Sequence, residues 1–401
     1  MKVVEINSVC GIRSTGRICT DIADMLQENG DECRIGYGRS EVPSRYRPIA
    51  VPIGNKNSLL IHGIGSRLFD NTGFYSKAAT RRFLKWLDAY QPDLIHLHNI
   101  HGYYLNIEIL FRYLKEKKIP VVWTLHDCWP CTGHCSHFAA TGCQKWQVEC
   151  HDCVLRREYP TSMLVDNSRK NYRRKKAMFC GVEKLRIVTP SNWLTGCVSQ
   201  SFLGGYPIQT IPNGVDLSVF HPTESDFIQK YHLENKKVIL GVASAWSNHK
   251  GLDAFYRLAQ ILDEAYQVVL VGLTEQQIRN LPGNILGIRR TNSIEELAQI
   301  YTAAYVHVSM SVEETMGMTV IEANACGTPV IVFDCTALPE IVTAETGVVL
   351  RSCTPETVAK TIVGTDFSKD RFSAACIAHA WRFEKKKMYS QYIELYRSMV
   401  T

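Results

Sequence analysis

The stretch that decides the fold runs from Met310 to Ile331 and has the sequence MSVEETMGMTVIEANACGTPVI. Apolar segments stand at both ends, the second ending at Phe333, so the pattern predicts a strand, a loop, a helix and another strand. Glu314 falls in the predicted loop, where Gly317 lets the backbone approach a ligand closely. Glu322 follows about two helical turns later, so we expect both carboxylates to line one wall of a site.

The start of this predicted helix favours an anion. Its free N–H groups and the positive end of the helix dipole suit a diphosphate, and two nearby carboxylates suit sugar hydroxyls. The stretch therefore predicts a nucleotide-sugar site, and the alternative is an ordinary helix that carries two surface glutamates. The residues expected to bind the donor here are Met316, Gly317, Met318, Thr319 and Glu322.

Several short motifs resemble one known enzyme family. Glu314 and Glu322 are separated by seven residues, and the second opens the sequence EANACGTPVI. The same family pattern is present in Pro212–Asp216 (PNGVD), His249–Gly251 (HKG) and Leu125–Asp127 (LHD). These residues resemble retaining glycosyltransferases of family 4 over nearly the whole chain. The resemblance implies the GT-B fold, an α/β architecture of two Rossmann-like doubly wound domains facing each other across a cleft. It also implies catalysis without a required cofactor.

Composition is that of a globular protein. The chain has 401 residues, of which 45% are apolar and 21% charged, enough for two domains with separate cores. No apolar run approaches the roughly 18 residues that would span a bilayer. We expect the first residues to form a short strand and not a signal peptide. Fifteen cysteines without a secretion signal favour the reducing cytoplasm.

Charge is unevenly distributed. Residues 1–190 carry 28 Lys and Arg against 18 Asp and Glu, whereas residues 191–401 carry 17 against 21. A basic first half without a nucleic-acid-binding motif indicates an anionic acceptor or an anionic membrane surface. The segment Ser168–Lys176 (SRKNYRRKK), with Arg156 and Arg157 before it, is the expected contact. A solvated basic face is the alternative.

The resemblance implies a division into two domains. Residues 1–190 are expected to form the acceptor domain and residues 191–383 the donor domain, with a helix at about 384–401 packing back onto the first. We expect irregular loops over residues 40–75, which are rich in Gly, Ser, Asn and Pro. A short strand, Gln209–Ile211, is expected to open the second domain.

Glycines follow the first strand, where a backbone often approaches a ligand. Gly16 and Arg17 end the predicted loop and begin a helix expected over Arg17–Asn29. The resemblance implies that this loop lies near donor phosphate or acceptor. A surface position in the first helical turn is the alternative for Arg17, because the full dinucleotide fingerprint is missing.

Histidines follow two predicted strands of the first domain. His98 and His101 come after one strand, and Pro120–Leu125 delivers His126 and Asp127 to the same sheet edge. Ligands of open α/β sheets bind at the carboxyl ends of strands. The resemblance implies that His126 faces the reacting sugar, and we expect Asp127 to orient it.

A cysteine-rich segment, residues 128–153, holds six of the fifteen cysteines. Cys128–Cys131 and Cys150–Cys153 both have the two-residue gap typical of zinc ligands. Free or redox-active thiols are the alternative, because the spacing between the two pairs is not a standard finger pattern. The residues expected to hold a structural zinc ion are Cys135, Cys143, Cys150 and Cys153.

The chain departs from the family pattern at the phosphate-binding loop. Family-4 enzymes usually hold the donor diphosphate with an arginine and a lysine. Lys250 matches, but Ala245 stands where the arginine is expected. A guanidinium gives phosphate a bidentate contact, so its loss leaves Arg17, His249 or Arg290 as possible replacements.

These observations predict transfer of a sugar, with retention of configuration, from a UDP- or GDP-sugar to a glycan or a polyprenyl-diphosphate-linked acceptor. Glu314 is expected to hold sugar hydroxyls, Lys250 the diphosphate and His126 the reacting sugar. The resemblance implies assembly of capsule, exopolysaccharide or a related surface polysaccharide at the inner face of a bacterial cytoplasmic membrane, with no nucleic-acid partner. The alternatives are a catalytically inactive paralogue that serves as an assembly component and a nucleotide-sugar 2-epimerase.

Overall fold

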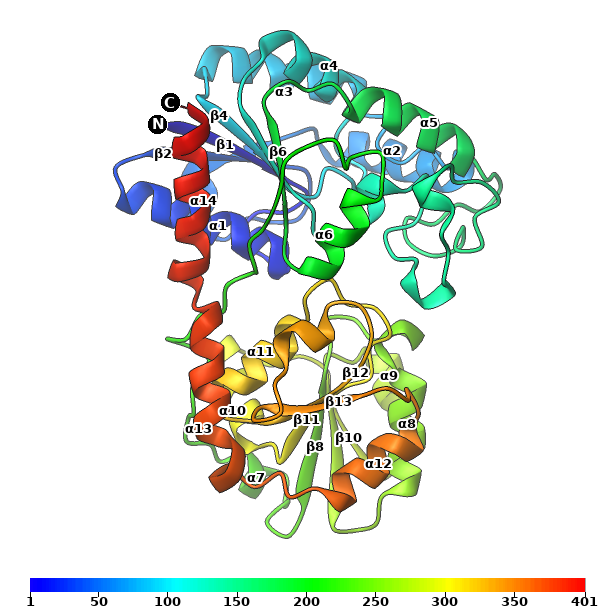
Figure 1. Cartoon of the computed structure of the whole chain (residues 1–401), viewed down its shortest axis with the longest axis vertical. Helices are drawn as coiled ribbons and strands as arrows, with labels where there is room; N and C mark the ends of the chain where they lie inside the picture. The colour runs from blue at the N-terminus through cyan, green and yellow to red at the C-terminus, as the bar shows by residue number, and fades with distance from the viewer. Residues whose placement is uncertain (401) are drawn as a thin grey trace. The chain divides into compact units, whose positions relative to one another are not determined.

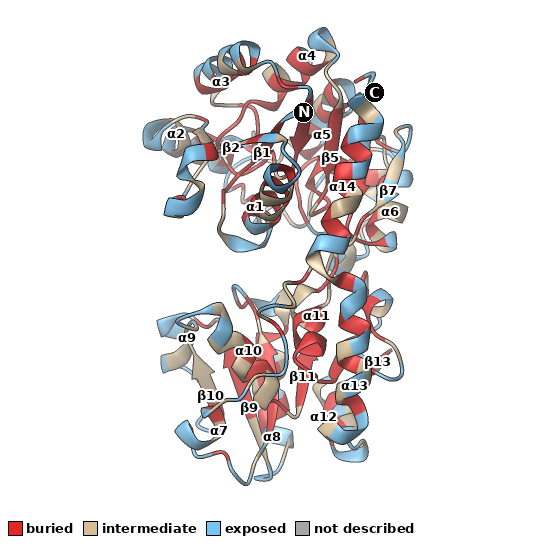
Figure 2. Cartoon of the chain, turned by 90° about the vertical axis from the view of Figure 1, so that its left-hand side faces the viewer, coloured by how far each residue is buried: buried red, intermediate tan, exposed pale blue. Residues whose placement is uncertain are grey.

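The computed structural model describes residues 1–400, which form two compact units (Figure 1). Unit 1 comprises Met1–Pro212 and the chain from Met388 onward, and unit 2 comprises Asn213–Lys387. Each unit is built on one parallel sheet, and Figure 2 shows that the central strands, such as β1, β5 and β11, are buried, whereas the edge strand β10 is only partly buried. Across the described chain, no helix is long and apolar enough to cross a membrane.

Unit 1 contains a seven-stranded sheet of order β3-β2-β1-β4-β5-β6-β7. Strands of a parallel sheet are covered on both faces, so they form nearly continuous apolar runs. Glu5 in β1 is an exception, because it is charged in sequence and fully buried. The strands are β1 (Lys2–Asn7), β2 (Glu32–Tyr37), β3 (Ala50–Pro52), β4 (Leu94–Leu97), β5 (Val121–Thr124), β6 (Leu185–Thr189) and β7 (Ile208–Thr210).

Helices cover both faces of this sheet. One core cluster includes residues of α1 and α14, and the other includes residues of α3, α4 and α5. In the second cluster Trp123 of β5 packs against Phe111 of α4 and Phe179 of α5, with ring centroids 5.3 and 4.9 Å away. The helices are α1 (Arg13–Glu28), α2 (Lys56–Phe69), α3 (Lys77–Tyr90), α4 (Ile107–Lys117), α5 (Ser168–Phe179), α6 (Asn192–Ser199) and α14 (Lys385–Val400).

Unit 2 contains a six-stranded parallel sheet of order β10-β9-β8-β11-β12-β13. Its strands are β8 (Lys237–Val242), β9 (Tyr266–Val271), β10 (Ile285–Ile288), β11 (Val306–Ser309), β12 (Val330–Phe333) and β13 (Gly347–Leu350). Its helices are α7 (Phe227–Lys230), α8 (Leu252–Ile261), α9 (Glu275–Arg279), α10 (Ile294–Ala303), α11 (Met318–Ala325), α12 (Pro355–Gly364) and α13 (Lys369–Ala380). Strand β11, the loop with Glu314, helix α11 and strand β12 follow one another here, in the order strand, loop, helix and strand that was predicted around Met310–Ile331.

Helix α14 is shared between the units. Near its start, the Lys385 ammonium pairs with Asp216 at 2.6 Å within unit 2. Further along, Tyr392 and Tyr396 are fully buried in unit 1, where their hydroxyls reach the side chains of Thr124 and His96. The last helix thus completes the core cluster that faces α1.

The structure corrects three predicted elements. Residues 40–75 are not only loops, because α2 forms there behind a capping box between Asn55 and Ser58. Helix α1 begins at Arg13, four residues before the expected start. The strand expected to open the second domain is β7, which pairs in parallel with β6 and so extends the first sheet.

The basic run in α5 is largely engaged within unit 1. Arg169 and Arg173 both pair with Glu149, at 3.4 and 2.5 Å. Arg174 pairs with Glu108, and Lys175 is buried. The six cations of this run were expected to contact an anionic acceptor or membrane surface. Four of them have partners inside unit 1 instead.

Candidate functional site

Two histidines meet at the carboxyl edge of the first sheet. Strands β4 and β5 are parallel neighbours, with Leu97 opposite Trp123, so the residues that follow them emerge together. His98 Nδ1 lies 3.0 Å from His126 Nε2, and the two rings are stacked with planes 9° apart. Burial lowers the pKa of His126 to about 4, which makes its imidazole neutral at physiological pH.

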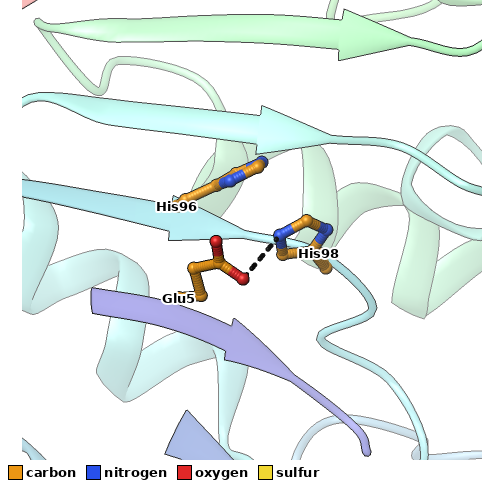
Figure 3. A group of neighbouring side chains, drawn as sticks. All are labelled: Glu5, His96 and His98. Carbon is orange, nitrogen blue, oxygen red and sulfur yellow. Dashed lines mark ion pairs between the residues drawn. The ribbon is translucent and has the colours of Figure 1, made fainter. Parts of the chain in front are cut away.

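Glu5 lies next to His98, further inside the sheet (Figure 3). Its Oε2 is 3.6 Å from His98 Nε2, and both side chains are fully buried. Neither carboxyl oxygen nor that nitrogen has a conventional hydrogen-bond partner, although the Cys19 thiol lies beside the carboxyl. Burial raises the pKa of Glu5 well above its ordinary value and lowers that of His98. The pair is therefore a contact between a neutral acid and a neutral imidazole, not a salt bridge.

The contact between the two histidines is a single hydrogen bond. One ring donates its N–H and the other accepts on a nitrogen lone pair, at 3.0 Å between His98 Nδ1 and His126 Nε2. Because burial keeps His126 neutral, its ring has one donor nitrogen and one acceptor nitrogen at the sheet edge.

His96 completes the group in Figure 3. The ligand atoms of Glu5, His96 and His98 lie within 4.8 Å of one another, a spacing that would allow a metal ion. His96, however, uses both nitrogens on hydroxyls, 2.7 Å from Thr124 and 2.5 Å from Tyr396. Because only two of the three side chains have a free ligand atom, this donor set does not fit a resident metal ion.

Asp127 has a different partner from the one the sequence suggested. Its Oδ2 lies 2.8 Å from His101 Nε2, and its Oδ1 accepts the backbone N–H of Trp129 at 2.9 Å. Burial opposes ionisation, but His101, His137 and the Trp129 N–H together outweigh it and lower the pKa of Asp127 to about 2. His101 Nδ1 in turn contacts the Tyr159 hydroxyl at 3.1 Å. Asp127 therefore orients His101, and His98 is a hydrogen-bond partner of His126.

Gly16 and Arg17 lie inside α1 and not in the loop before it. Gly16 is buried, and its carbonyl accepts the N–H of Gly11 at 3.0 Å. A Cβ at this position would stand 3.0 Å from Val9, so the glycine permits close packing of loop and helix. Arg17 is exposed on the first turns of the helix.

In unit 2, the structure brings Lys250 and Glu314 together. The ammonium is 2.5 Å from a carboxylate oxygen, and both side chains stay partly exposed. The two loops are also joined by their backbones, because Val312 N–H donates to the His249 carbonyl at 3.1 Å. Gly251 has a φ of +77°, and a Cβ there would stand 2.4 Å from Met310, so only glycine allows this approach.

The two predicted glutamates have different environments. Glu314 donates its backbone N–H to the Thr336 hydroxyl at 2.9 Å, which fixes the loop. Glu322 is only 9% exposed on α11, and its Oε2 accepts from the Tyr301 hydroxyl at 3.1 Å. Glu314 is thus the more accessible carboxylate of the two.

The helix that follows begins where the sequence predicted an anion site. Gly317, with a φ of +91°, is the residue before α11, whose first residues Met318 and Thr319 are partly exposed. Met316 is 2% exposed, and its sulfur lies 3.0 Å from the Asn213 nitrogen. Its side chain therefore belongs to the core, and only its backbone remains for a ligand.

In the loop where Ala245 replaces the expected arginine, the next residue is a buried tryptophan. Ala245 is exposed, whereas Trp246 points inward and donates its indole N–H to the Val271 carbonyl at 2.9 Å. Arg290, one suggested replacement, is exposed. Sequence reasoning also missed Glu5, although a charged residue within the apolar run of a first strand was a visible signal.

Two protein-family models match the chain, one mainly in unit 1 and one in unit 2. Residues 15–219 match the model described as Glycosyltransferase Family 4, and residues 236–365 match the model described as Glycosyl transferases group 1. Among curated relatives, the O-antigen chain mannosyltransferase RfbU of Salmonella typhimurium is 30% identical over 128 residues, which is 30% of this chain and 35% of that protein. The aligned segments span about a third of the length of the first curated relatives.

Solved structures resemble the chain over its whole length. Sucrose-phosphate synthase from Thermosynechococcus elongatus aligns with a TM-score of 0.72 and 18% identity, covering 99% of this chain and 98% of that one. Anabaena HepE in complex with UDP aligns with a TM-score of 0.66 and 17% identity, covering 99% and 100%. These likenesses confirm the predicted GT-B fold class of two parallel α/β sheets. The Glycosyltransferase Family 4 model matches residues 15–219, which is just over half of the chain. The chain therefore belongs to glycosyltransferase family 4.

Proposed function

We propose that this glycosyltransferase moves a sugar from a nucleotide diphosphate sugar to a hydroxyl of a glycan or lipid-linked acceptor, with retention of configuration, in the synthesis of a cell-surface polysaccharide. The observation that carries the proposal is the partly exposed Lys250–Glu314 pair at 2.5 Å, beside the start of α11. The name of the relative RfbU, an O-antigen chain mannosyltransferase, supports the polysaccharide context.

In this proposal Lys250 exchanges partners when the donor binds. The ammonium leaves Glu314 for the diphosphate, whose charge is also met by the backbone N–H groups at the start of α11. The freed Glu314 then accepts hydrogen bonds from sugar hydroxyls, and Glu322 with the Tyr301 hydroxyl serves the ribose. The same lysine stabilises the diphosphate as it leaves.

The reaction exchanges one bond at the anomeric carbon for another. The bond to the diphosphate oxygen breaks, a bond to the acceptor oxygen forms on the same face, and the acceptor proton passes to the departing phosphate oxygen. His126 has a pKa of about 4, so it takes part as a neutral hydrogen-bonding group on the reacting sugar and not as a charged acid. Glu5 and His98 act as positioning residues: His98 holds the His126 ring by a hydrogen bond, and Glu5 packs against His98.

Helix α2 is the part of unit 1 that best suits a lipid-linked acceptor. Its apolar residues Leu60, Ile61 and Ile64 are 62, 64 and 49% exposed, whereas His62 and Ser66 are buried. Figure 2 shows the exposed side of α2 in pale blue. A helix with its apolar face toward solvent fits the headgroup boundary of a membrane, which the paired cations of α5 fit less well. We therefore place peripheral membrane contact at α2.

The test of the function is a donor screen followed by product analysis. Purified protein is melted with UDP, GDP, ADP and their common sugars, because a ligand at a hundred times its dissociation constant adds about 2.7 kcal/mol of stability. We expect one nucleotide class to raise the melting temperature, and Lys250→Ala to abolish that shift. Lys360→Ala, an exposed lysine of α12, is the matched control.

With the stabilising donor, the anomeric configuration of the product is then read by NMR. We expect the configuration of the donor to be kept in the new glycosidic bond. No shift with any nucleotide would contradict the proposal and favour an inactive paralogue. A changed sugar nucleotide formed without acceptor would instead favour an epimerase.

A further inference from the structure

The cysteine-rich segment of unit 1 encloses a cavity that sugar transfer does not use. Its volume is about 320 Å³, and none of the thiols around it forms a disulfide. The side chains around it that can bind a metal are Cys135, Cys143, Cys150, Cys153, His134, His151 and Asp152.

Three of these thiols, Cys135, Cys150 and Cys153, line the same cavity. Cys135 and Cys153 are neighbours, and Cys150 lies near both. The backbone N–H of Gly133 donates to the Cys150 sulfur, and that of Leu155 donates to the Cys153 sulfur. The thiolate is the form of cysteine that binds metal ions, and a bound cation removes the proton from a coordinating thiol.

Gly133 has a packing role at this site. A Cβ there would lie 2.0 Å from the Ser168 carbonyl oxygen and 2.9 Å from the Cys150 Cβ. The first contact is to backbone and cannot yield easily, so only glycine allows the Cys150 loop to come this close.

His134 is an independent sign of a ligand. It is 2% exposed, its Nδ1 lies 2.5 Å from an oxygen of Asp70, and its Nε2 has no hydrogen-bond partner. Because the carboxylate can only accept, the hydrogen is on Nδ1, and Nε2 presents a lone pair. A carboxylate on one ring nitrogen and an open second nitrogen is the arrangement found for metal-binding histidines.

The groups that orient these ligands are themselves fixed. The second oxygen of Asp70 accepts the Asn167 N–H at 2.8 Å, and its carbonyl accepts from the Asn171 side chain. Asp166 accepts the Cys153 N–H at 2.6 Å. The cysteine-rich segment is thus tied to the end of α2 and to the start of α5.

We propose that this cavity is a structural zinc site, in which the thiolates of Cys135, Cys150 and Cys153 and the Nε2 of His134 hold one Zn²⁺. Soft sulfur ligands with one imidazole select zinc, and four protein ligands leave no open position for catalysis. The sequence alone suggested Cys143 as the fourth ligand. His134 is favoured because it is buried and held by Asp70, whereas Cys143 is partly exposed.

The net charge of the proposed site and the spacing of its ligands indicate how the cavity would change on zinc binding. Three thiolates and Zn²⁺ leave one negative charge, and the buried Lys175 ammonium, held by the carbonyls of Trp129 and Thr132 at 2.8 and 3.0 Å, lies close enough to Cys135 and Cys150 to balance it. Over residues 1–400, Glu5, His96 and His98 form the only group of three or more His, Cys, Asp or Glu residues whose ligand atoms all lie within 4.8 Å of one another. The four proposed zinc ligands are therefore more widely spaced, and a bound ion would draw them inward and shrink the cavity.

The test measures metal directly in the full-length protein. Zinc is counted by mass spectrometry after dialysis against a weak chelator, and Co²⁺ is titrated into the zinc-free protein. We expect about one zinc ion per chain, together with the sulfur-to-cobalt absorption of three thiolates. Cys150→Ser and Cys153→Ser should lose the metal, and Asp70→Asn should weaken binding about 10- to 100-fold. Cys180→Ser, in the same unit, and Cys353→Ser, exposed in unit 2, should keep it.

The outcomes test separately whether the protein binds a metal ion and which residues bind it. Protein that binds neither zinc nor Co²⁺, or a disulfide between Cys135 and Cys153 found by mass, would overturn the site. Zinc lost from Cys143→Ser but kept in His134→Gln would overturn the ligand assignment in favour of four cysteines. If a cysteine variant fails to fold, the wild-type protein still decides, because chelation should then speed proteolysis of the cysteine-rich segment.

Discussion

The carboxyl edge of the first sheet and the Lys250 and Glu314 loops of unit 2 are built in opposite ways. At the first, Glu5, His98 and His126 are deeply buried, and the pKa shifts that burial causes leave all three neutral. At the second, Lys250 and Glu314 form a partly exposed pair. A neutral, fixed group can orient a substrate without changing its own charge, whereas an exposed ion pair can exchange one partner for an incoming phosphate. In the function proposed above, the neutral group of unit 1 orients the substrate and the ion pair of unit 2 binds its charge.

The strongest way to break the comparison is to remove the charge from unit 2. Lys250→Ala should lower kcat/KM by about 10²- to 10³-fold, or about 3–4 kcal/mol, because one preorganised stabiliser of the leaving diphosphate is lost. Lys250→Arg should recover part of the rate, since it restores the charge with a different geometry. Initial rates of donor consumption measure both. An equal loss in the exposed Lys360→Ala would show that the effect is not specific to this pair.

The next test concerns the neutral state of His126. Its folded pKa of about 4 lies below the ordinary value of 6.5, so its contribution to stability is complete above pH 6.5 and is lost as the pH falls through 4. Between these values the wild-type protein should lose about 3 kcal/mol more than His126→Asn, which lacks the titrating group. Urea unfolding at several pH values measures the difference. Parallel curves for the two proteins would mean that His126 is not neutralised by burial.

Glu5 should show the opposite sign. Its folded pKa is raised, so its contribution is complete below the ordinary glutamate value of about 4.3 and is lost as the pH rises through the folded value. Relative to Glu5→Gln, a neutral isostere, wild type should lose about 1.4 kcal/mol per pH unit in that window. The same unfolding series provides the measurement, and near pH 4 the two proteins should be closest in stability. A wild-type advantage that grows with pH would indicate a charged Glu5 and a true ion pair with His98.

The sequence was informative where one strand or one loop determines the geometry. Parallel strands end at a common edge, so His98 and His126 could be expected together, and the Lys250 and Glu314 loops follow adjacent strands of one sheet. The contact between Glu5 and His98 was not visible, because it depends on which buried side chains face each other across neighbouring strands.

Long-range pairing was the main source of error. Asp70 and His134 are far apart in sequence, and no local pattern connects them. The partner of Asp127 also depended on the loop that carries His101. Helix α2 was missed because its buried face consists of His62, Gly65 and Ser66, so its apolar periodicity points outward instead of toward a core.

The exposed apolar side of α2 gives the prediction with the smallest effect on the stability of the folded protein. Replacing Leu60, Ile61 and Ile64 by Ser should change the free energy of unfolding by less than about 0.5 kcal/mol per site, because these side chains are already exposed. Sedimentation with vesicles of anionic lipid should nevertheless fall several-fold, and turnover of a water-soluble acceptor should not change. Val363→Ser, equally exposed on α12, should leave vesicle binding unaltered. Unchanged sedimentation of the triple variant would instead assign membrane contact to another surface. The first surface to test would then be that of α5, where Lys170 and Lys176 are the two cations not paired in unit 1.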